Sequence, residues 1–481
     1  MSRAATTRNS PLRRGRRAHH ALLALIAAAA AGCATVDPEQ TLEPVRTLAG
    51  PALGPSLQWA RDDDARAALD TRVGELLSAP LSMDAAVQVA LLNNRGLQAE
   101  FDALGISEAE RLQAGRLPNP GFSFARLRRG DEREIERSFH FDLARLIFMP
   151  TIGRLEARRH AREQRRVAMA VLDLAARTRQ AWVDAVAARE ALAYADQVKR
   201  TADTSAMLAR RMAQAGNFSK LQQAREQGFY ADAAINRARA ELAATIAREQ
   251  LVRLLGVHGE QLSFTLPARL PDLPDEPRDI PDVVRTALAQ RLDVQAARIA
   301  VEQLAENLGM VRTNRFIEVL EVGVIRNGSN EAPTQTGWEI GLELPLFDWG
   351  TARVARAEAA MRQATNAAAR TAIEARSEVR QAYVAYRTAY DIARQYRDEI
   401  VPLRQRIAEE NLYRYNGMLI GVFELLADAR AQVGAVEAYM RALRDFWVAQ
   451  ADLDAAMIGR PALTPVGDAP AAMNAGADAG H

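Results

Sequence analysis

The chain has 481 residues, of which 25% are charged and 48% hydrophobic, a composition that suits a folded protein and excludes a disordered one. Aromatic residues make up only 6% and alanine is abundant, which favours long, closely packed helices over a large globular core. The formal net charge is +2, but six arginines precede residue 33 with no acidic residue among them. Subtracting these six charges leaves −4, so the charge gives no support for nucleic-acid binding.

Residues 1–32 are predicted to form a signal peptide. After a basic start, 11 apolar residues run from Ala21 to Ala31, too few to cross a bilayer core as a helix. They lead into Ala30-Ala31-Gly32-Cys33, which is similar to a bacterial lipobox and implies a lipid anchor, with palmitate among its acyl chains, on the only cysteine. The alternative is a free thiol beside an ordinary cleavage site. Ala34 follows the cysteine, and in this the segment resembles lipoproteins delivered to the outer membrane, because an aspartate there would favour retention in the inner membrane.

The remainder of the chain is duplicated with a period near 200 residues. Residues 90–99 align with 287–296 at an offset of 197, and Gly216 matches Gly417 at an offset of 201. We therefore expect two repeats, 81–259 and 280–459, joined by a linker at 260–279. Residues 33–80 are predicted to be an irregular lead-in from the lipid anchor, and 460–481 a disordered tail.

Each repeat is predicted to contain a helix pair, two strands, a very long helix, a tight turn and a shorter returning helix. The strands alternate: in 337–344 the even positions are apolar, while Glu339, Gly341 and Glu343 face the other way. Residues 138–143 alternate similarly, with weaker partners at 121–124 and 320–324. A soluble sandwich could also alternate, but four lone strands cannot close a core. Strands with one apolar and one polar face fit a membrane barrel wall with a water-filled lumen.

The long helices carry coiled-coil signals. From Thr351 to about Tyr415 only Pro402 interrupts the helical pattern, over roughly 97 Å at 1.5 Å per residue. Heptad positions are occupied by Val379, Tyr386, Ala393, Ile400 and Ile407 in the second half, and by Ala181, Ala188, Ala195 and Ala202 in the first. Pro402 is expected to kink the helix locally.

With these features assembled, the chain resembles the outer membrane efflux family, the TolC-like proteins, over roughly residues 81–459. The strongest pieces are Leu344-Pro345-Leu346-Phe347-Asp348-Trp349-Gly350, similar to the family's strand-to-helix junction, and Arg414-Tyr415-Asn416-Gly417 before Leu425-Leu426. Ile400-Val401-Pro402 also resembles a family feature. Pro150-Thr151-Ile152-Gly153 is a poor first-half copy of the junction, and the long second tip resembles that of the heavy-metal-pump branch.

The resemblance implies a mainly α fold with a membrane β-barrel portion. Three protomers would each give four strands to a barrel of about twelve, continuous with an α-helical tunnel through the periplasm. The implied partners of this homotrimer are a periplasmic membrane-fusion adaptor, an inner-membrane pump of the RND type and outer-membrane lipid. The implied role is passive conduction of small solutes, drugs or metal ions, with no catalysis and no cofactor.

The two hairpin tips are predicted to dock the adaptor. The tip residues are Gly216, Asn217, Phe218 and Ser219 in the first half and Tyr415, Gly417, Met418 and Leu419 in the second. Glycine at both turns permits the left-handed backbone that ends a helix. The apolar run 418–423 needs a covering partner if it is exposed; the alternative is that the tips pack on one another and close the duct. The nearest acids, Glu424 and Asp428, are the candidate aperture carboxylates.

No constellation for catalysis or metal binding is present. Outside the signal segment and the last residue, the histidines are His140, His160 and His258, far apart, with no HExxH, P-loop or GxSxG motif. We interpret His140 as a lumen-facing residue. The basic run 126–129 is interpreted as a solvated face or loop tip, with a lipopolysaccharide-contacting surface loop as the alternative. Two other classes stay open: a periplasmic adaptor, which should carry one hairpin between compact β domains, and a structural coiled-coil lipoprotein, which should lack amphipathic strands.

Overall fold

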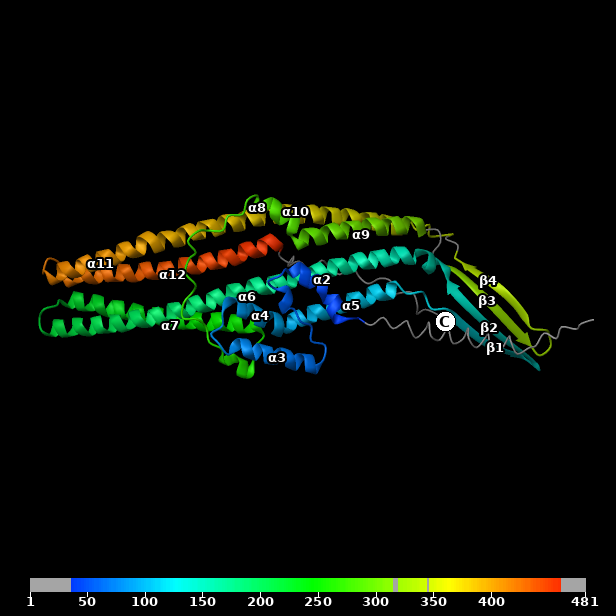
Figure 1. The fold of residues 1–481 in the computed structure, drawn as a ribbon, viewed down its shortest axis with the longest axis horizontal. Helices are drawn as coiled ribbons and strands as arrows, with labels where there is room; N and C mark the ends of the chain where they lie inside the picture. Colours follow the sequence, from blue (N-terminus) through cyan, green and yellow to red (C-terminus); the bar gives the residue numbers. More distant parts are fainter. Residues whose placement is uncertain (1–35, 315–318, 344–345, 460–481) are drawn as a thin grey trace, which may run out of the picture.

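The computed structural model describes residues 36–314, 319–343 and 346–459, apart from the side chain of Phe423. The molecule is a long helical bundle with a four-stranded sheet at one end (Figure 1). None of the helices in these ranges is both long enough and apolar enough to cross a membrane.

Both halves of the chain have the predicted order of elements. The first half contains α4 (Met83–Asn93), α5 (Arg95–Ala114), β1 (Gly121–Arg129), β2 (Glu132–Asp142), α6 (Leu143–Gln214) and α7 (Lys220–Leu255). After the short η2 (Gly259–Ser263), the second half contains α8 (Val283–Gln290), α9 (Leu292–Asn314), β3 (Leu320–Ser329), β4 (Gln335–Leu342), α10 (Thr351–Gln395), the π-helical turn η3 (Tyr396–Ile400), α11 (Val401–Asn416) and α12 (Val422–Ile458).

The two long helical rods determine the length of the molecule. Helix α6 has 72 residues, or about 108 Å at 1.5 Å per residue, and α10, η3 and α11 together run about 99 Å. Along the half near the sheet, α5 and α9 flank these rods, and along the distal half α7 and α12 return beside them (Figure 1). The predicted disturbance at Pro402 takes the form of the π turn just before it, where the amide of Val401 donates to the carbonyl of Tyr396.

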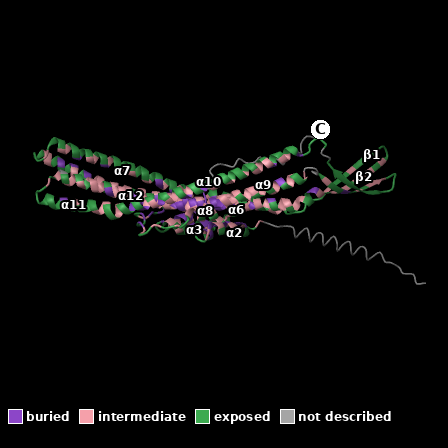
Figure 2. Cartoon of the chain, turned by 90° about the horizontal axis from the view of Figure 1, so that it is seen from above, coloured by how far each residue is buried: buried purple, intermediate pink, exposed green. Residues whose placement is uncertain are grey.

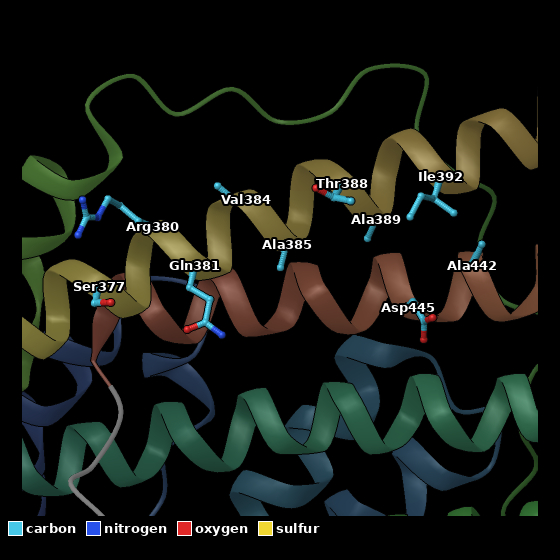
Figure 3. Close-up of a pocket in the computed structure, with 10 residues that line it drawn as sticks. All are labelled: Ser377, Arg380, Gln381, Val384, Ala385, Thr388, Ala389, Ile392, Ala442 and Asp445. Carbon is cyan, nitrogen blue, oxygen red and sulfur yellow. The ribbon is translucent and has the colours of Figure 1, made fainter.

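The predicted heptad seam of α10 is buried mainly against other helices of the second half, α8 and α12. Val379, Tyr386 and Ala393 are fully or almost fully buried, and the ring of Phe446 on α12 lies 5.6 Å from that of Tyr386. An open groove of about 730 Å³ remains between α10 and α12 (Figure 3). It is lined largely by small and apolar side chains, and two of them on α10, Val384 and Ile392, are exposed.

Tyrosine hydroxyls hold the segment between the two halves against α10. The hydroxyl of Tyr386 accepts from the backbone amide of Arg278 at 2.8 Å, and that of Tyr383 donates to the carboxylate of Asp279 at 2.9 Å. The hydroxyl of Tyr390 donates to a backbone carbonyl of the same segment. These tyrosines are therefore core residues with a polar end, as expected for buried phenols.

The aligned segments of the duplication lie at equivalent helix junctions, and each junction caps a returning helix. In the first half the side-chain amide of Asn94 donates to the carbonyl of Leu254 at the end of α7, at 3.0 Å. The equivalent residue of the second half, Arg291, is 2% exposed and donates to the carbonyl of Ala456 near the end of α12, at 2.9 Å. Arg291 also binds Asp293 at 2.6 Å. Both solutions satisfy carbonyls that a helix end leaves unpaired.

The lead-in before the first repeat was predicted to be irregular, and this is wrong: the segment is mainly helical. It forms α2 (Pro38–Ala49), η1 (Gly54–Ser56) and α3 (Asp63–Leu77). Asp37 caps α2 by accepting from the amide of Glu39 at 3.0 Å, and Pro38 follows at the first helical position. Asp62 likewise caps α3 by accepting from the amide of Ala65, so proline and acidic residues start helices in this segment.

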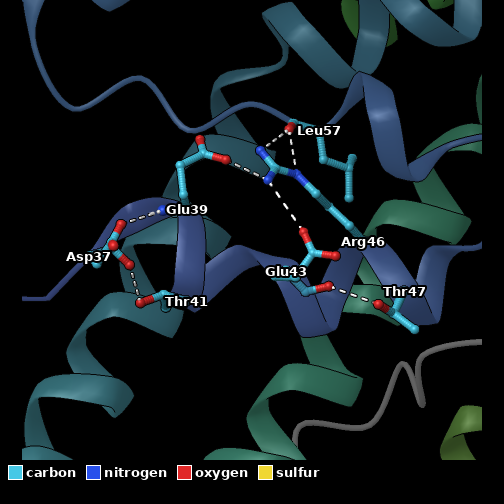
Figure 4. A network of polar contacts seen from close by, with 7 residues as sticks. All are labelled: Asp37, Glu39, Thr41, Glu43, Arg46, Thr47 and Leu57. Carbon is cyan, nitrogen blue, oxygen red and sulfur yellow. Dashed lines mark hydrogen bonds and ion pairs between the residues drawn. The ribbon is translucent and has the colours of Figure 1, made fainter.

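The N-terminal helices belong to the main core of the protein. Arg46 on α2 donates to the carbonyl of Leu57 at 3.0 Å and pairs with Glu39 at 2.5 Å (Figure 4). Leu42 and Val45 on the other face of α2 are fully buried in a cluster that includes α4, α6 and α12. The buried residues gather midway along the bundle, while both ends are mostly exposed (Figure 2).

Candidate functional site: sheet faces and hairpin tips

The four strands form one antiparallel sheet in the order β1-β2-β3-β4. Antiparallel partners place their side chains on the same face, so the register assigns every residue to a face. One row, which crosses all four strands, consists of Phe122, Phe139, Val324 and Trp338. The first two rings are 4.8 Å apart, and Trp338 is 75% exposed. The predicted alternation is therefore present, and its apolar side faces solvent in the protomer.

We call this side the apolar face. It carries Phe122, Phe124, Phe139, Phe141, Leu320, Val322, Val324, Trp338, Ile340 and Leu342. Except for Leu320, all are exposed by more than a third. No described helix covers this face, which is a large apolar surface for a protein in water.

The opposite side is the polar face, which carries His140, Glu321 and Glu339. The alternation in the sequence predicted this side for Glu339. Glycines stand beside the large side chains. A Cβ atom on Gly323 would lie 2.7 Å from the carboxylate of Glu339, and one on Gly121 would overlap the ring of His140. These polar side chains therefore lie flat across the sheet over their glycine neighbours.

The first and last strands have open edges. β1 pairs only with β2 and β4 only with β3 among the described residues, so both outer strands leave backbone amides and carbonyls unpaired. Unpaired edges are avoided in water and are not tolerated in lipid.

The first hairpin tip has the predicted glycine turn. Gly216 has φ +83, a left-handed backbone, and Asn217 donates back to the carbonyl of Met212 at 2.9 Å. Ser219 then starts α7 with a capping box, in which its hydroxyl accepts from the amide of Gln222. Phe218, between these residues, is half-buried.

The second tip differs from the prediction in the residue that turns the chain. Gly417 has φ −78, and Met418 takes the left-handed backbone, with φ +57. A non-glycine residue in that region is uncommon, so the second tip is the more strained of the two. The turn closes when the amide of Leu419 donates to the carbonyl of Arg414 at 2.8 Å. The glycine matched by the duplication therefore does not have the conformation of Gly216.

The second tip exposes its apolar side chains. Met418 is 94% exposed and Leu419 73%, while Tyr415 is 38% exposed. Ile420 and Val422 are half-buried, and the side chain of Phe423 lies outside those described. Of the side chains in the predicted run that the structure describes, Met418 and Leu419 are the exposed ones.

The two candidate aperture carboxylates near this tip have different surroundings. Glu424 is exposed, whereas Asp428 accepts a hydrogen bond from the side-chain amide of Asn411 on α11.

A third acid near the tips, Glu226, was not predicted from the sequence. Glu226 on α7 is 1% exposed, accepts from the hydroxyl of Ser205 at 2.8 Å and pairs with Arg430 of α12 at 2.6 Å. It therefore joins the two hairpins about 10 Å from the first tip. The available signal was a glutamate in a heptad position otherwise occupied by alanine, seven residues before the buried Ala233.

The histidines do not assemble into a site. No group of three His, Cys, Asp or Glu side chains in the described ranges is placed to hold a metal ion. His160 is buried between α5 and α6, with Nδ1 3.2 Å from the hydroxyl of Ser107 and Nε2 3.3 Å from Glu108. Burial lowers the pKa of His160, and the negative charge of Glu108 only partly offsets this effect. Cys33 lies outside the described residues.

No protein-family model and no curated protein matches the sequence, but solved structures do. The Campylobacter jejuni CmeC outer membrane channel aligns with a TM-score of 0.68 and 18% identity over 79% of this chain and 86% of CmeC. The open state of the Neisseria gonorrhoeae MtrE outer membrane channel gives 0.66 and 18% over 79% and 89%. The outer membrane protein VceC of Vibrio cholerae gives 0.66 and 14% over 79% and 96%. The chain therefore has the fold of the TolC-like outer membrane channels.

Proposed function

We propose that the protein is the outer-membrane channel of a tripartite efflux system. It passively conducts small solutes, either drugs or metal ions, to the exterior. The observation that carries this proposal is the sheet: one apolar exposed face, one polar face and two open edges, at the end of helical rods about 100 Å long. An apolar band backed by polar residues is the pattern of a barrel wall that separates lipid from water. The role has no catalytic step and needs no cofactor.

A single protomer cannot perform this role, because its open strand edges would face lipid. Three copies would pair β4 of one protomer with β1 of the next and close a barrel of about twelve strands. The groove beside α10 supports the same assembly, since Val384 is 63% exposed and Ile392 47% exposed along a flank that a neighbouring helix could cover. We therefore infer a homotrimer in which helices of adjacent protomers form a continuous tunnel.

The hairpin tips are proposed to dock a periplasmic membrane-fusion adaptor, which would connect the channel to an inner-membrane pump of the RND type. The tips lie at the end of the rods opposite the sheet, and Met418 and Leu419 expose apolar surface there. The alternative is that the tips cover one another and close the duct at rest. Lipidation at Cys33 is proposed to add a second attachment to the outer membrane.

Leu419→Asp and Phe218→Asp distinguish docking from closure. Docking predicts loss of export and of adaptor crosslinking, with normal trimers in the outer membrane. Persistent crosslinking in cells that become permeable to large antibiotics would favour closure. Asp203→Asn removes an exposed acid of α6 about 20 Å from the first tip; it is the control and should change neither readout.

The channel itself is tested by cysteine pairs across the open edges. Within one protomer β1 and β4 are separated by two strands, about 14 Å, which is too far for a disulfide. A cysteine at Ser123 or Ala125 on β1, combined with Gly337→Cys on β4, should therefore yield covalent trimers under oxidation, whereas each single variant should not. The purified trimer should conduct ions in a planar bilayer. Monomers that neither crosslink nor conduct would contradict the proposal and favour an adaptor or a structural lipoprotein.

A further inference from the structure

Charge sign, as well as hydrophobicity, separates the two faces of the sheet. All acidic residues within the four strands lie on the polar face: Glu132, Glu134, Glu136, Asp142, Glu321 and Glu339. Five of the six arginines within the strands lie on the apolar face: Arg126, Arg128, Arg133, Arg137 and Arg326. We call these five residues the arginine rim; all are exposed. The basic run 126–129 is exposed, as predicted, and is divided between the two faces of the sheet.

The arginine rim has no internal counter-charge. Arg128 stands directly opposite Arg133, and Arg137 directly opposite Arg326. Side chains in such cross-strand pairs start about 5 Å apart, and like charges there are destabilising. Among the described residues no acid forms an ion pair with any of the five, and Arg128 donates only to the carbonyl of Gly130, at 3.0 Å. The sheet thus carries uncompensated positive charge on the same face as its apolar band.

The position of the rim along the strands indicates what could neutralise it. Starting from the helical end, the apolar rows come first, and the row that contains Phe139 and Trp338 is their last complete one. Arg137 and Arg326 lie one row beyond, about 7 Å further along the strands, and Arg128 and Arg133 lie nearest the β1–β2 turn. Apolar side chains, then aromatic rings, then guanidinium groups match the order of acyl chains, interface and anionic head groups in a leaflet.

We propose that the arginine rim binds the phosphate groups of anionic glycolipids in the outer leaflet of the membrane. This inference rests on the proposed function, because it requires the apolar face to lie in the outer membrane. Guanidinium groups bind phosphate oxygens in a bidentate, charge-assisted geometry, and paired arginines become favourable once a phosphate lies between them. A neighbouring protomer cannot take this place, because neighbours would pair through strand edges and leave both faces free. The adaptor would lie about 100 Å away, at the tips.

The test uses the full-length trimer in neutral detergent, with lipid A that carries two phosphates as the probe. A variant with Arg128, Arg133, Arg137 and Arg326 changed to Gln should bind lipid A with at least tenfold lower apparent affinity. Binding is measured by native mass spectrometry and by the rise in the melting temperature of the trimer when lipid A is added. The matched control changes Glu134, Glu136, Glu321 and Glu339 to Gln, which removes four charges from the polar face of the same sheet. It should change the affinity less than twofold. Equal effects, or none, would overturn the proposal.

Two further experiments complete the test. The first distinguishes phosphate binding by the arginines from a purely structural role, and the second distinguishes a lipid ligand from free phosphate. Arg326→Gln alone relieves the repulsion with Arg137, so we expect a higher melting temperature without lipid and a smaller rise when lipid A is added. A variant that melts lower in both conditions would contradict the proposal. Lipid A with one phosphate should bind more weakly, and sodium pyrophosphate should not stabilise the trimer; stabilisation by pyrophosphate equal to that by lipid A would exclude a lipid site.

The outcome is separable from that of the proposed function. If the wild-type chain forms no conducting trimer, the channel proposal fails and the rim proposal fails with it. If the wild type conducts but the arginine variant binds lipid A as tightly as the wild type does, only the rim proposal fails.

Discussion

Substitution of Ile340 by arginine tests the assignment of the sheet faces. Ile340 lies opposite Val322 in an apolar row, with a further apolar row on each side of it along the strands. An arginine there would be about 7 Å from the next row in either direction and could not easily reach a head group. A cationic residue on the lipid face near the bilayer midplane costs about 2–4 kcal/mol, or roughly 30-fold to 1,000-fold in the insertion equilibrium. If the three copies act independently, the trimer loses about 6–12 kcal/mol.

The neighbouring residue provides the control. Glu339 is adjacent in the same strand but belongs to the polar face, so Glu339→Arg should shift stability by only about 0.5 kcal/mol and alter the charge of the lumen. The measurement is the fraction of heat-modifiable trimer in outer-membrane fractions, together with urea unfolding of the protein refolded into bilayers. Equal losses in the two variants, or a greater loss for Glu339→Arg, would refute the assignment of faces.

Three further predictions concern other parts of the chain. Arg430→Ala should destabilise the protein by about 3 kcal/mol in thermal or urea unfolding, because it leaves the buried Glu226 without its cation. Arg237→Ala, which breaks an exposed pair with Asp196, is the comparison and should destabilise the protein much less. His160→Gln should make the protein less sensitive to acid. Burial lowers the pKa of His160 below its usual 6.5, so folding favours the neutral ring, and this stabilisation is present above about pH 6.5 and is lost as the pH falls through the lower pKa of the folded state; an unchanged acid-unfolding midpoint would contradict it. Cys33→Ser should abolish lipidation without preventing trimer formation, and mass spectrometry that finds an unmodified Cys33 in the mature wild type would exclude the anchor.

The order of elements and the strand faces could be predicted from the sequence because both depend on local periodicity. Residues two apart in a strand share a face whatever the fold, so the alternation around Glu339 and Ile340 already separated polar from apolar sides. The heptads through Tyr386 and Ala393 likewise depend only on helix geometry. The duplication placed the two helix junctions correctly for the same reason, since both copies repeat one local pattern.

The features that were missed depend on contacts between distant segments. Helix α2 is held by a core that α4 and α6 complete, and Glu226 becomes a link between hairpins only because Arg430 lies beside it, about 200 residues later in the chain. At the second tip, backbone hydrogen bonds from both sides of the turn put the left-handed conformation on Met418 and not on Gly417.

The sequence alone determined the repeats, the long helices and the two-faced strands, because each follows from residue spacing along one segment. Only the tertiary structure decided which side chains meet. It is strand register that sets Arg137 opposite Arg326 and collects the acids on the other face, and register is a relation between segments that no single segment contains. Packing between the two halves similarly decides that Arg291 is buried as a helix cap while its counterpart in the duplication, Asn94, performs the same task as an amide.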